Sequence, residues 1–395
     1  MRYPLKRQLL VLVMGALTLA ACVRVQPAPE PVTNATPVAT RFIPYTLVAP
    51  SDEPPPTDIP PTLPPPPTPL AEAIGPYTYP ELVNPLTGLA TDDPATLERR
   101  PIVAKISNAP PLVRPQAGIG QADLVFEHYA EGGLTRFSAV FYSQMPERVG
   151  SIRSARLIDN EVVPMYDALL AYSGASTGVN QVIDTSDFAK RTYMGIMYGA
   201  PYYFRDEEIP VPHNMFVNLA ALSRLATQEG LNVRPSLDGM AFLAEPPANA
   251  DGDVTVIDIR YIATRVRWEY DAEAGVYRRF SDGQPHFDAN TGQQVTASNV
   301  AIIYAEHEFS DIVESEWQGN VSYGLSIKLW FDGEAVLFRD GKRYDGVWVR
   351  PTREDMIQLR TYDGELLYFK PGNTFFQVMR PPADQDPAEE GLTVQ

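Results

Sequence analysis

The chain contains a single cysteine, Cys22, and its position limits both the fold and the location of the protein. Residues 1–21 begin with the basic residues Arg2, Lys6 and Arg7 and continue as an apolar run that ends directly before Cys22. This order is typical of a secretory signal, and the apolar run is too short to cross a bilayer as a helix. We predict cleavage before Cys22 and acylation of that cysteine, which anchors the chain to the extracytoplasmic face of the cell membrane. The alternative is an ordinary secreted protein with a free cysteine.

One cysteine excludes disulfide bonds within the chain, and acylation would also exclude a thiol nucleophile. An ordinary hydrophobic core must therefore stabilise the folded part. Loss of the three basic residues of the signal changes the formal net charge from −17 to −20. Such an acidic body is repelled by nucleic acid and by anionic headgroups, so we expect no nucleic-acid partner. The lipid chains, rather than electrostatic attraction, are expected to hold the protein at the membrane.

Proline, threonine, alanine and valine dominate residues 22–80, which include the proline runs 54–56 and 64–67. Such a segment lacks apolar periodicity and favours the extended polyproline II conformation. We predict a disordered stalk, on the order of 100 Å long or more where it is extended at ~3.1 Å per residue. A ligand for proline-binding domains is the alternative interpretation.

The remaining chain is long enough for two domains. A segment rich in proline, glycine and aspartate at residues 245–253 is the best candidate for the boundary. We predict an N-terminal domain over residues 81–247, a C-terminal domain over residues 253–382, and a disordered tail over residues 383–395.

The pattern of apolar residues predicts different folds for the two domains. The N-terminal domain mixes short buried strands with helices; the expected strands are 102–106, 124–129, 137–142 and 168–172, and the helices 155–163 and 217–229. In the C-terminal domain apolar residues alternate, as in Val254–Ile259 and Arg265–Tyr270, which predicts half-buried strands. Asp-Gly pairs, a hairpin signal, begin at Asp282, Asp332, Asp340, Asp345 and Asp363. The predicted class is α+β, with a mixed α/β N-terminal domain followed by a mainly antiparallel β C-terminal domain.

A series of motifs, taken in order, resembles the YerB-like bacterial lipoproteins. The resemblance covers the chain from Asn84 to about Met379, and it implies an N-terminal and a C-terminal domain of a family without an established reaction. Tyr172 departs from the family pattern, which has a histidine there, and the turn at Gly319–Gly324 is less regular than in relatives. The matching motifs include Asn84–Leu89, Arg114–Gly118, Gln121–Glu127, Glu131–Phe137, Gly150–Arg156, Pro212–Asn214, Pro285–Asp288 and Asn299–Val300.

Arg153, Ser154 and Arg156 form the first candidate site. If a helix begins near Ser151 or Ser154, the serine caps it and the two arginines share one face, which favours an anion. Guanidinium groups bind carboxylate or phosphate in a bidentate fork. The wider set of candidate ligand-binding residues adds Asn108, Arg114, Glu127, Arg136, His213 and Asn214, with Arg205 as an extension. The alternative is that the arginines form internal ion pairs with Asp123, Glu127, Glu131 or Asp159.

Ser176 is the second candidate, because Gly174-Ala175-Ser176-Thr177-Gly178 fits the pattern of a hydrolase nucleophile elbow. His213 and one of the intervening aspartates, Asp184, Asp187 or Asp206, would complete a catalytic triad. The alternative is a tight turn in which Ser176 caps the next helix.

Glu127 and Glu131 are a third candidate, as a carboxylate pair for general acid and base catalysis on a cell-wall glycan. Salt bridges to neighbouring arginines are the more common use of such residues.

Metal binding has little support in the sequence. The four histidines, His128, His213, His286 and His307, are scattered and none has ligand spacing to another. We interpret His286 and Asp288 as a turn contact, and we expect no metal and no cofactor. Tyr198, Tyr202, Tyr203 and Phe204 beside Arg205 form either a sugar-stacking wall or a core cluster.

Taken together, the sequence favours a non-enzymatic, membrane-anchored envelope lipoprotein. We expect the N-terminal domain to bind an anionic cell-wall ligand or an envelope protein through an arginine-lined groove. A cell-envelope hydrolase and a pure scaffold are the alternatives.

Overall fold

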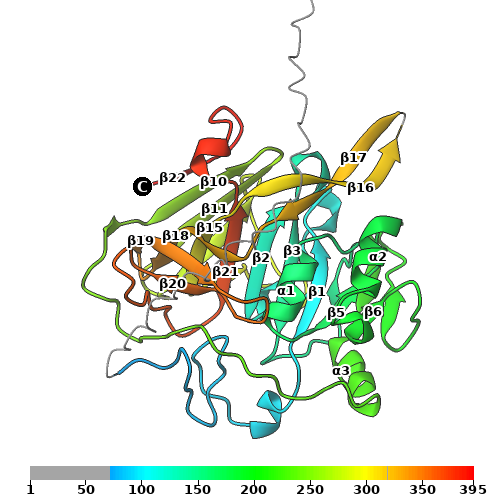
Figure 1. Cartoon of the computed structure of the whole chain (residues 1–395), viewed down its shortest axis with the longest axis horizontal. Coiled ribbons are helices and arrows are strands. Elements are labelled where there is room, and N and C mark those ends of the chain that lie inside the picture. Colours follow the sequence, from blue (N-terminus) through cyan, green and yellow to red (C-terminus); the bar gives the residue numbers. More distant parts are fainter. Residues whose placement is uncertain (1–71, 318) are drawn as a thin grey trace, which may run out of the picture. The chain divides into compact units, whose positions relative to one another are not determined.

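Strands from both halves of the sequence join in one large mixed sheet in the structure, a computed structural model that describes residues 72–317 and 319–395. The first half contributes β1 (Ile102–Ser107), β2 (Leu124–Tyr129), β3 (Thr135–Phe141), β5 (Leu169–Tyr172) and β6 (Thr192–Met194). The second half contributes β9 (Gly252–Asp253), β15 (Asn299–Tyr304), β18 (Phe331–Arg339), β19 (Lys342–Arg350), β20 (Gln358–Arg360) and β21 (Thr374–Met379). The strand order is β20-β19-β18-β15-β21-β2-β3-β1-β5-β6, with β9 beside β19 (Figure 1).

The two halves meet where β2 pairs in parallel with β21. Leu124 lies opposite Thr374, and Phe126 lies opposite Phe376. The two phenylalanine rings stack with their centroids 4.6 Å apart, an offset contact that adds to the burial of both rings. The sheet and its core are therefore continuous across the predicted boundary at 245–253, and the position of that boundary stays a prediction.

Smaller sheets surround the large one. The second sheet has the order β13-β12-β11-β10-β22, with β14 beside β12; a short sheet has the order β4-β8-β7, and β16 and β17 form a separate hairpin. Their bounds are β4 (Val149–Gly150), β7 (Tyr203–Arg205), β8 (Met215–Val217), β10 (Val256–Tyr261), β11 (Thr264–Asp271), β12 (Val276–Ser281), β13 (Gln284–Pro285), β14 (Thr296–Ala297), β16 (His307–Trp317), β17 (Asn320–Ile327) and β22 (Gly391–Val394).

Helices cover both faces of the large sheet. Side chains of α1 (Asp159–Met165) and α2 (Thr177–Asp184) belong to one hydrophobic cluster, and those of α3 (Leu219–Gln228) and the second sheet belong to another. Burial on both faces explains why β1, β2, β15 and β21 are buried along their whole length. Short 3-10 helices lie at Pro94–Leu97, Pro111–Val113, Ile119–Gln121, Glu131–Gly133, Ala189–Arg191 and Pro382–Asp384.

The predicted α+β class is confirmed, but the helix expected over 155–163 begins only at Asp159. The residues before Asp159 form backbone hydrogen bonds with distant segments of the chain instead of the i to i−4 bonds of a helix. The Arg153 N–H donates to the Lys105 carbonyl at 2.8 Å, and the Ala155 N–H donates to the Gly174 carbonyl at 2.9 Å. Neither Ser151 nor Ser154 therefore caps a helix, and the two arginines do not share a helix face.

The Asp-Gly pairs divide into turns and strand positions. Asp340-Gly341 closes the β18–β19 hairpin with both residues at positive φ, as the hairpin signal predicts. Asp332-Gly333 and Asp345-Gly346, in contrast, lie inside β18 and β19. At Gly346 a Cβ atom would approach the Arg360 carbonyl oxygen to 2.1 Å, so this glycine permits close packing of strands rather than a turn.

The predicted signal peptide, Cys22 and most of the stalk lie outside the described residues. The stalk prediction is wrong for residues 72–80, which pack against the folded body. The Ile74 N–H donates to the Phe242 carbonyl at 2.9 Å, and the Tyr79 hydroxyl donates to the Met240 carbonyl at 2.6 Å. Among the described residues, no helix combines the length and apolar composition that a membrane crossing requires.

The predicted disordered tail is also wrong, because its last residues form β22 at the edge of the second sheet. Ile259 of β10 lies opposite Leu392. Glu390, which is buried, accepts hydrogen bonds from the Tyr129 hydroxyl and from Arg380 and thereby fixes the start of the strand. Sequence composition gave no indication of this anchor.

Candidate functional site

Three of the predicted arginines line one cavity of about 380 Å³, here called the arginine cavity. It opens at the ends of β1 and β3, beside the turn Glu131–Gly133 and residues 263–264 of the second half. Arg114, Arg136 and Arg153 line it together with Glu131, Thr135 and Asp282. The structure thus brings together arginines that are up to 39 positions apart in the sequence, and a role for them in ligand binding stays a prediction.

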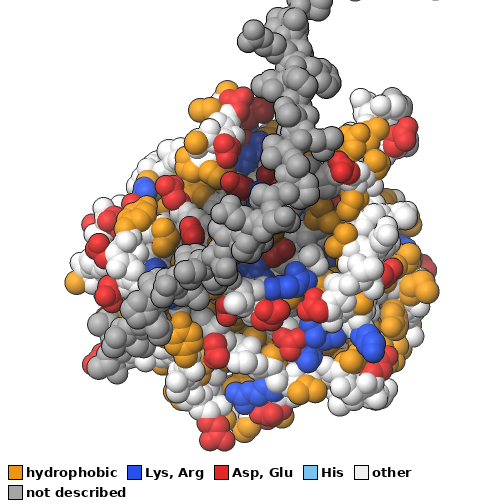
Figure 2. Space-filling model, in the orientation of Figure 1, with side chains coloured by type: hydrophobic (Ala, Val, Ile, Leu, Met, Phe, Trp, Pro, Cys, Tyr) orange, Lys and Arg blue, Asp and Glu red, His pale blue; other side chains and the backbone are white. Residues whose placement is uncertain are grey.

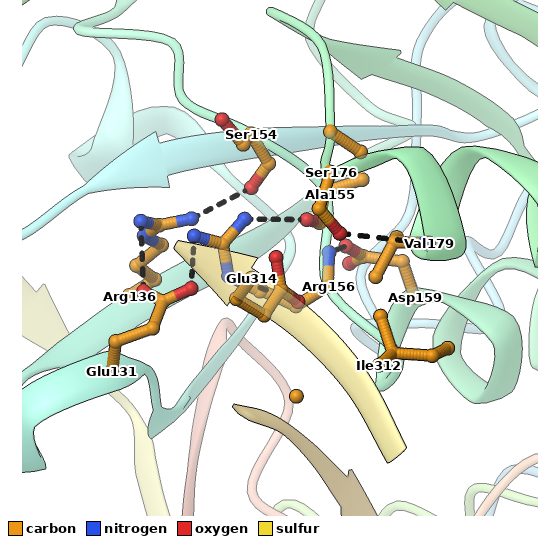
Figure 3. A network of polar contacts seen from close by, with 12 residues as sticks. Glu131, Arg136, Ser154, Ala155, Arg156, Asp159, Ser176, Val179, Ile312 and Glu314 are labelled. Carbon is orange, nitrogen blue, oxygen red and sulfur yellow. Dashed lines mark hydrogen bonds and ion pairs between the residues drawn. The ribbon is translucent and has the colours of Figure 1, made fainter. Parts of the chain in front are cut away.

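Arg136 lies on β3, and two contacts of its guanidinium group hold it in place (Figure 3). Its Nη2 lies 3.1 Å from Oε2 of Glu131, and its Nη1 donates to the Ser154 carbonyl at 2.9 Å. Burial, reinforced by the neighbouring charge of Arg156, lowers the pKa of Arg136 to about 9. Positive charge is therefore crowded on this side of the cavity.

Arg153 is the least satisfied of the cavity arginines. Across residues 72–317 and 319–395 it has no ion pair and no side-chain hydrogen bond, and its Nε atom is buried without a partner. Burial and the charge of Arg156 lower its pKa. Burial lowers the pKa of the His213 imidazole, and the positive charge of Arg153 lowers it further. Arg153 thus retains unused donors for an anion.

Arg114 closes the opposite side of the cavity with a partner from the second half of the chain. Its Nη1 lies 2.6 Å from Oδ2 of Asp282, and its Nη2 donates to the Asn108 carbonyl at 2.9 Å. The side-chain amide of Asn108 donates to the buried Glu127 at 3.0 Å, and its Oδ1 accepts from Nε of Arg114 at 3.4 Å. Asn108 therefore positions Arg114 but does not line the arginine cavity.

Arg156 lies outside the arginine cavity, contrary to the expectation that it pairs with Arg153 around one anion. It forms an ion pair with Oε1 of Glu131, and its Nε lies 3.5 Å from Oε1 of Glu314 (Figure 3). Its Nη1 donates to the Ala155 carbonyl at 2.7 Å. Ser154 contributes to this network only the carbonyl that accepts from Arg136. Internal ion pairs, the alternative reading, thus account for Arg156.

Glu127 is fully buried and forms an ion pair with Arg279, so it cannot pair with Glu131 across a substrate. Its Oε2 lies 2.7 Å from Nη2 of Arg279, and its Oε1 accepts from Thr135 at 2.8 Å. Arg279 also donates to Nδ1 of His286. His286 therefore belongs to a buried network between the two halves and does not form the turn contact with Asp288 that the sequence suggested.

Ser176 caps α2, as the non-catalytic interpretation predicts. Its Oγ accepts from the Val179 N–H at 3.4 Å, and its hydroxyl lies close to the Glu314 carboxylate and stabilises the charged form of that group. No histidine is hydrogen-bonded to Ser176 within the described residues. His213 lies beside Arg153, and Asn214 accepts a hydrogen bond from Arg205 at 2.6 Å. The arrangement does not assemble the proposed triad.

Sequence reasoning missed Arg279 and Lys105, although each left a signal. In β12 the alternation places Arg279 on the same inward face as Tyr277. Lys105 interrupts the apolar run of β1 and is fully buried, with its Nζ 2.9 Å from Oδ1 of Asp159 and 2.9 Å from Nε2 of His128. A cation inside a buried strand requires a buried partner. Burial lowers the pKa of Lys105 to about 8.

The described ranges contain no group of three or more His, Cys, Asp or Glu side chains that is placed to hold a metal ion. The predicted aromatic wall is divided between two environments. Tyr203 is buried and donates to the Tyr193 carbonyl at 2.6 Å, whereas Tyr198 and Tyr202 form an edge-to-face pair. None of these aromatic residues lines the arginine cavity.

The fold and the cavity define an α+β protein in two sequential parts, and both parts match domains of one family. Residues 86–232 match the domain described as "Protein of unknown function (DUF3048) N-terminal domain". Residues 257–376 match "Protein of unknown function (DUF3048) C-terminal domain". The chain belongs to this family, which is the YerB-like family that the motifs resemble.

Two comparisons with individual proteins agree. The Bacillus subtilis (strain 168) protein named "Putative lipoprotein YerB" is 30% identical over 308 residues, which cover 77% of this chain and 88% of the relative. The crystal structure of the YerB protein from Bacillus subtilis superposes with a TM-score of 0.66 at 28% identity, covering 79% of this chain and 99% of that chain.

Proposed function

We propose that the chain is a lipid-anchored extracytoplasmic protein that binds an anionic envelope ligand in the arginine cavity without catalysing a reaction. The signal-like residues 1–21 and Cys22 support the anchor, as does the name of the Bacillus subtilis relative. Arg153 carries the binding part of the proposal, because it lines the cavity with unused donors. A carboxylate or a phosphate would satisfy these donors.

The charges around the arginine cavity support an anion in particular. Arg114 is balanced by Asp282, but Arg136 shares Glu131 with Arg156. Arg153 is therefore left without a carboxylate of its own. A local positive surplus in a chain of net charge −17 concentrates anions at this point.

Replacement of Arg153 by glutamine should weaken anion binding at least tenfold. A hydrogen bond to a charged group contributes about 1.5–3 kcal/mol, and about 1.4 kcal/mol corresponds to a factor of ten in affinity. Calorimetric titration of the full-length chain in detergent, with inorganic phosphate and with the carboxylate-bearing muramyl dipeptide, would measure the effect.

Arg205→Gln is the matched control, because it removes an exposed arginine that bonds Asn214 and does not line the cavity. It should bind like the unaltered chain. If the unaltered chain binds neither probe, or if both variants bind equally well, the cavity is not an anion site and a scaffold role is favoured instead.

Replacement of Cys22 by alanine should move the protein from the membrane fraction to the soluble fraction, because the multiple acyl chains of a bacterial lipoprotein are the expected anchor. Fractionation of expressing cells, with mass spectrometry of the mature N-terminus, would measure this. Val23→Ala, at the next position, should stay at the membrane. Retention of the Cys22 variant in the membrane would contradict the anchor.

A further inference from the structure

A second cavity, of about 370 Å³, lies between the β16–β17 hairpin and the turn Glu131–Gly133, and we call it the hairpin cavity. It shares Ala130 and Glu131 with the arginine cavity, so the two cavities lie on either side of that turn. Arg153 lines only the arginine cavity, and Glu314 lines only the hairpin cavity. The two can therefore be tested separately.

Glu314 is a buried carboxylate with unused acceptors. It extends from β16 toward Arg156 (Figure 3), and its side chain is 1% exposed. Neither carboxylate oxygen accepts a hydrogen bond of good geometry among the described residues, although the Ser176 hydroxyl lies close enough to stabilise the charged form. Its ion-pair contact to Nε of Arg156 measures 3.5 Å, longer than a hydrogen bond between such groups, and Arg156 is already paired with Glu131.

A buried carboxylate in this state is unfavourable, because it has lost its hydration without gaining hydrogen bonds of good geometry. Burial accordingly raises the pKa of the Glu314 carboxyl. In native proteins such groups are rare and call for a partner. A cation with several N–H donors would satisfy both oxygens of Glu314 from the hairpin cavity.

The charges around the hairpin cavity favour a cation. Arg156 and Arg380 line it together with Glu131 and Glu314. Arg380 forms an ion pair with Glu390, which does not line the cavity and whose carboxylate lies 3.2 Å from Nη1 of Arg380. Glu131 takes the short contacts of both Arg136 and Arg156, so Glu314 is left with only the 3.5 Å contact to Arg156.

The walls of the hairpin cavity favour an aliphatic chain attached to that cation. Phe309 and Tyr323 project from the hairpin with exposed fractions of 74% and 47%, and both line the cavity. Ile262 and Leu325 line it as well. Aromatic faces attract an ammonium group, and apolar walls pack against methylene groups. Figure 2 shows exposed hydrophobic side chains over the region of the hairpin.

We propose that the hairpin cavity binds a primary ammonium group on a short aliphatic chain, such as the side chain of a lysine or another diamino acid in a peptide. Glu314 receives the ammonium hydrogens, and Phe309 and Tyr323 contact the methylene chain. This site goes beyond the anion site of the arginine cavity and does not depend on it.

The test compares Nα-acetyl-lysine amide with Nα-acetyl-norleucine amide, which lacks the ammonium group. Titrated into the full-length chain in detergent, the lysine probe should bind at least tenfold more tightly than the norleucine probe. Glu314→Gln should remove that preference. Glu316→Gln, an exposed carboxylate on the same strand, should retain it, and so should Arg153→Gln.

The stability of Glu314→Gln separates a binding role from a structural one. An unsatisfied carboxylate predicts that this variant unfolds at a urea concentration no lower than the unaltered chain. Equal binding of the two probes, loss of the preference in Glu316→Gln, or a lowered unfolding midpoint for Glu314→Gln would each overturn the proposal. The Arg153→Gln control ensures that failure of the anion site is not mistaken for failure of this one.

Discussion

Replacement of Arg279 by methionine should lower the free energy of unfolding by about 3–5 kcal/mol, because it leaves the buried Glu127 carboxylate without its counter-charge. Both side chains are 0% exposed, and their charged atoms lie 2.7 Å apart. Urea unfolding of the full-length chain, followed by tryptophan fluorescence, would measure the loss. Methionine fills much of the same volume, so lost packing contributes little.

Arg278→Met provides a control at the adjacent position. Arg278 pairs with Asp271 at the surface and is 43% exposed. Exposed ion pairs contribute about 0–1 kcal/mol, so this variant should unfold nearly like the unaltered chain. A double variant that makes both Arg279 and Glu127 methionine should be more stable than Arg279→Met alone. Equal stability of the Arg278 and Arg279 variants would show that the buried pair does not hold the halves together.

The Arg279 network also explains why the two halves fold around one sheet. Glu127 and Gln116 come from the first half, whereas Arg279 and His286 come from the second. All four side chains are buried, and the contacts of Arg279 with Glu127 and of His286 with Gln116 join the two halves. Separation of the halves would expose the seam between β2 and β21 and leave these groups unpaired. The chain is therefore expected to unfold in one transition.

Sequence patterns predicted the strands well where burial alone determines them. β1 and β2 lie within one residue of the predicted ranges, because both faces of these strands are apolar. The start of α1 was missed because residues 152–155 bond to β1 and to Gly174, and local sequence carries no record of those partners. The β22 strand was missed for the same reason, since its partner β10 and the Tyr129 hydroxyl that binds Glu390 are distant in sequence.

For the candidate site, the sequence identified the arginines but not the residues that pair with them. Arg114, Arg136 and Arg153 were singled out from their residue type and near spacing, and they do line one cavity. The partners of the predicted arginines could not be inferred, because Asp282, in the turn between β12 and β13, and Glu314, on β16, lie more than 120 residues away in sequence. The pairing of Glu127 with Arg279 joins residues 152 positions apart. Such contacts depend on the register between β2 and β21, which no local pattern specifies.

The protein should lose stability steeply as the pH falls below about 6.5, because three histidines are buried as neutral imidazoles. Burial lowers the pKa of His307 to about 4 and holds the pKa values of His128 and His286 well below the usual range. Nearby cations reinforce the shifts, namely Lys105 beside His128 and Arg279 beside His286. Below pH 6.5 the unfolded chain binds protons at these histidines that the folded chain does not.

The sign of the effect follows from that difference in bound protons. As the pH falls from the unfolded pKa of a buried histidine toward its folded pKa, that histidine lowers the free energy of unfolding by about 1.4 kcal/mol per pH unit. The three histidines together lower it by about 4 kcal/mol per pH unit where their ranges overlap. Asp123 and Glu314, whose pKa values burial raises, oppose this slope at the acidic end of the range. Urea unfolding at pH 7, 6 and 5 would measure the slope.

His307→Asn should reduce that slope by about 1.4 kcal/mol per pH unit, the share of one histidine. Its amide can still donate to the Ala305 carbonyl, which the ring Nδ1 contacts at 2.8 Å. His213→Asn is the control, because His213 is partly exposed and its imidazole is less deeply buried. It should change the slope less. An unfolding midpoint that stays constant from pH 7 to pH 5 would mean that the buried histidines gain protons in the folded state, through local opening that releases them to solvent.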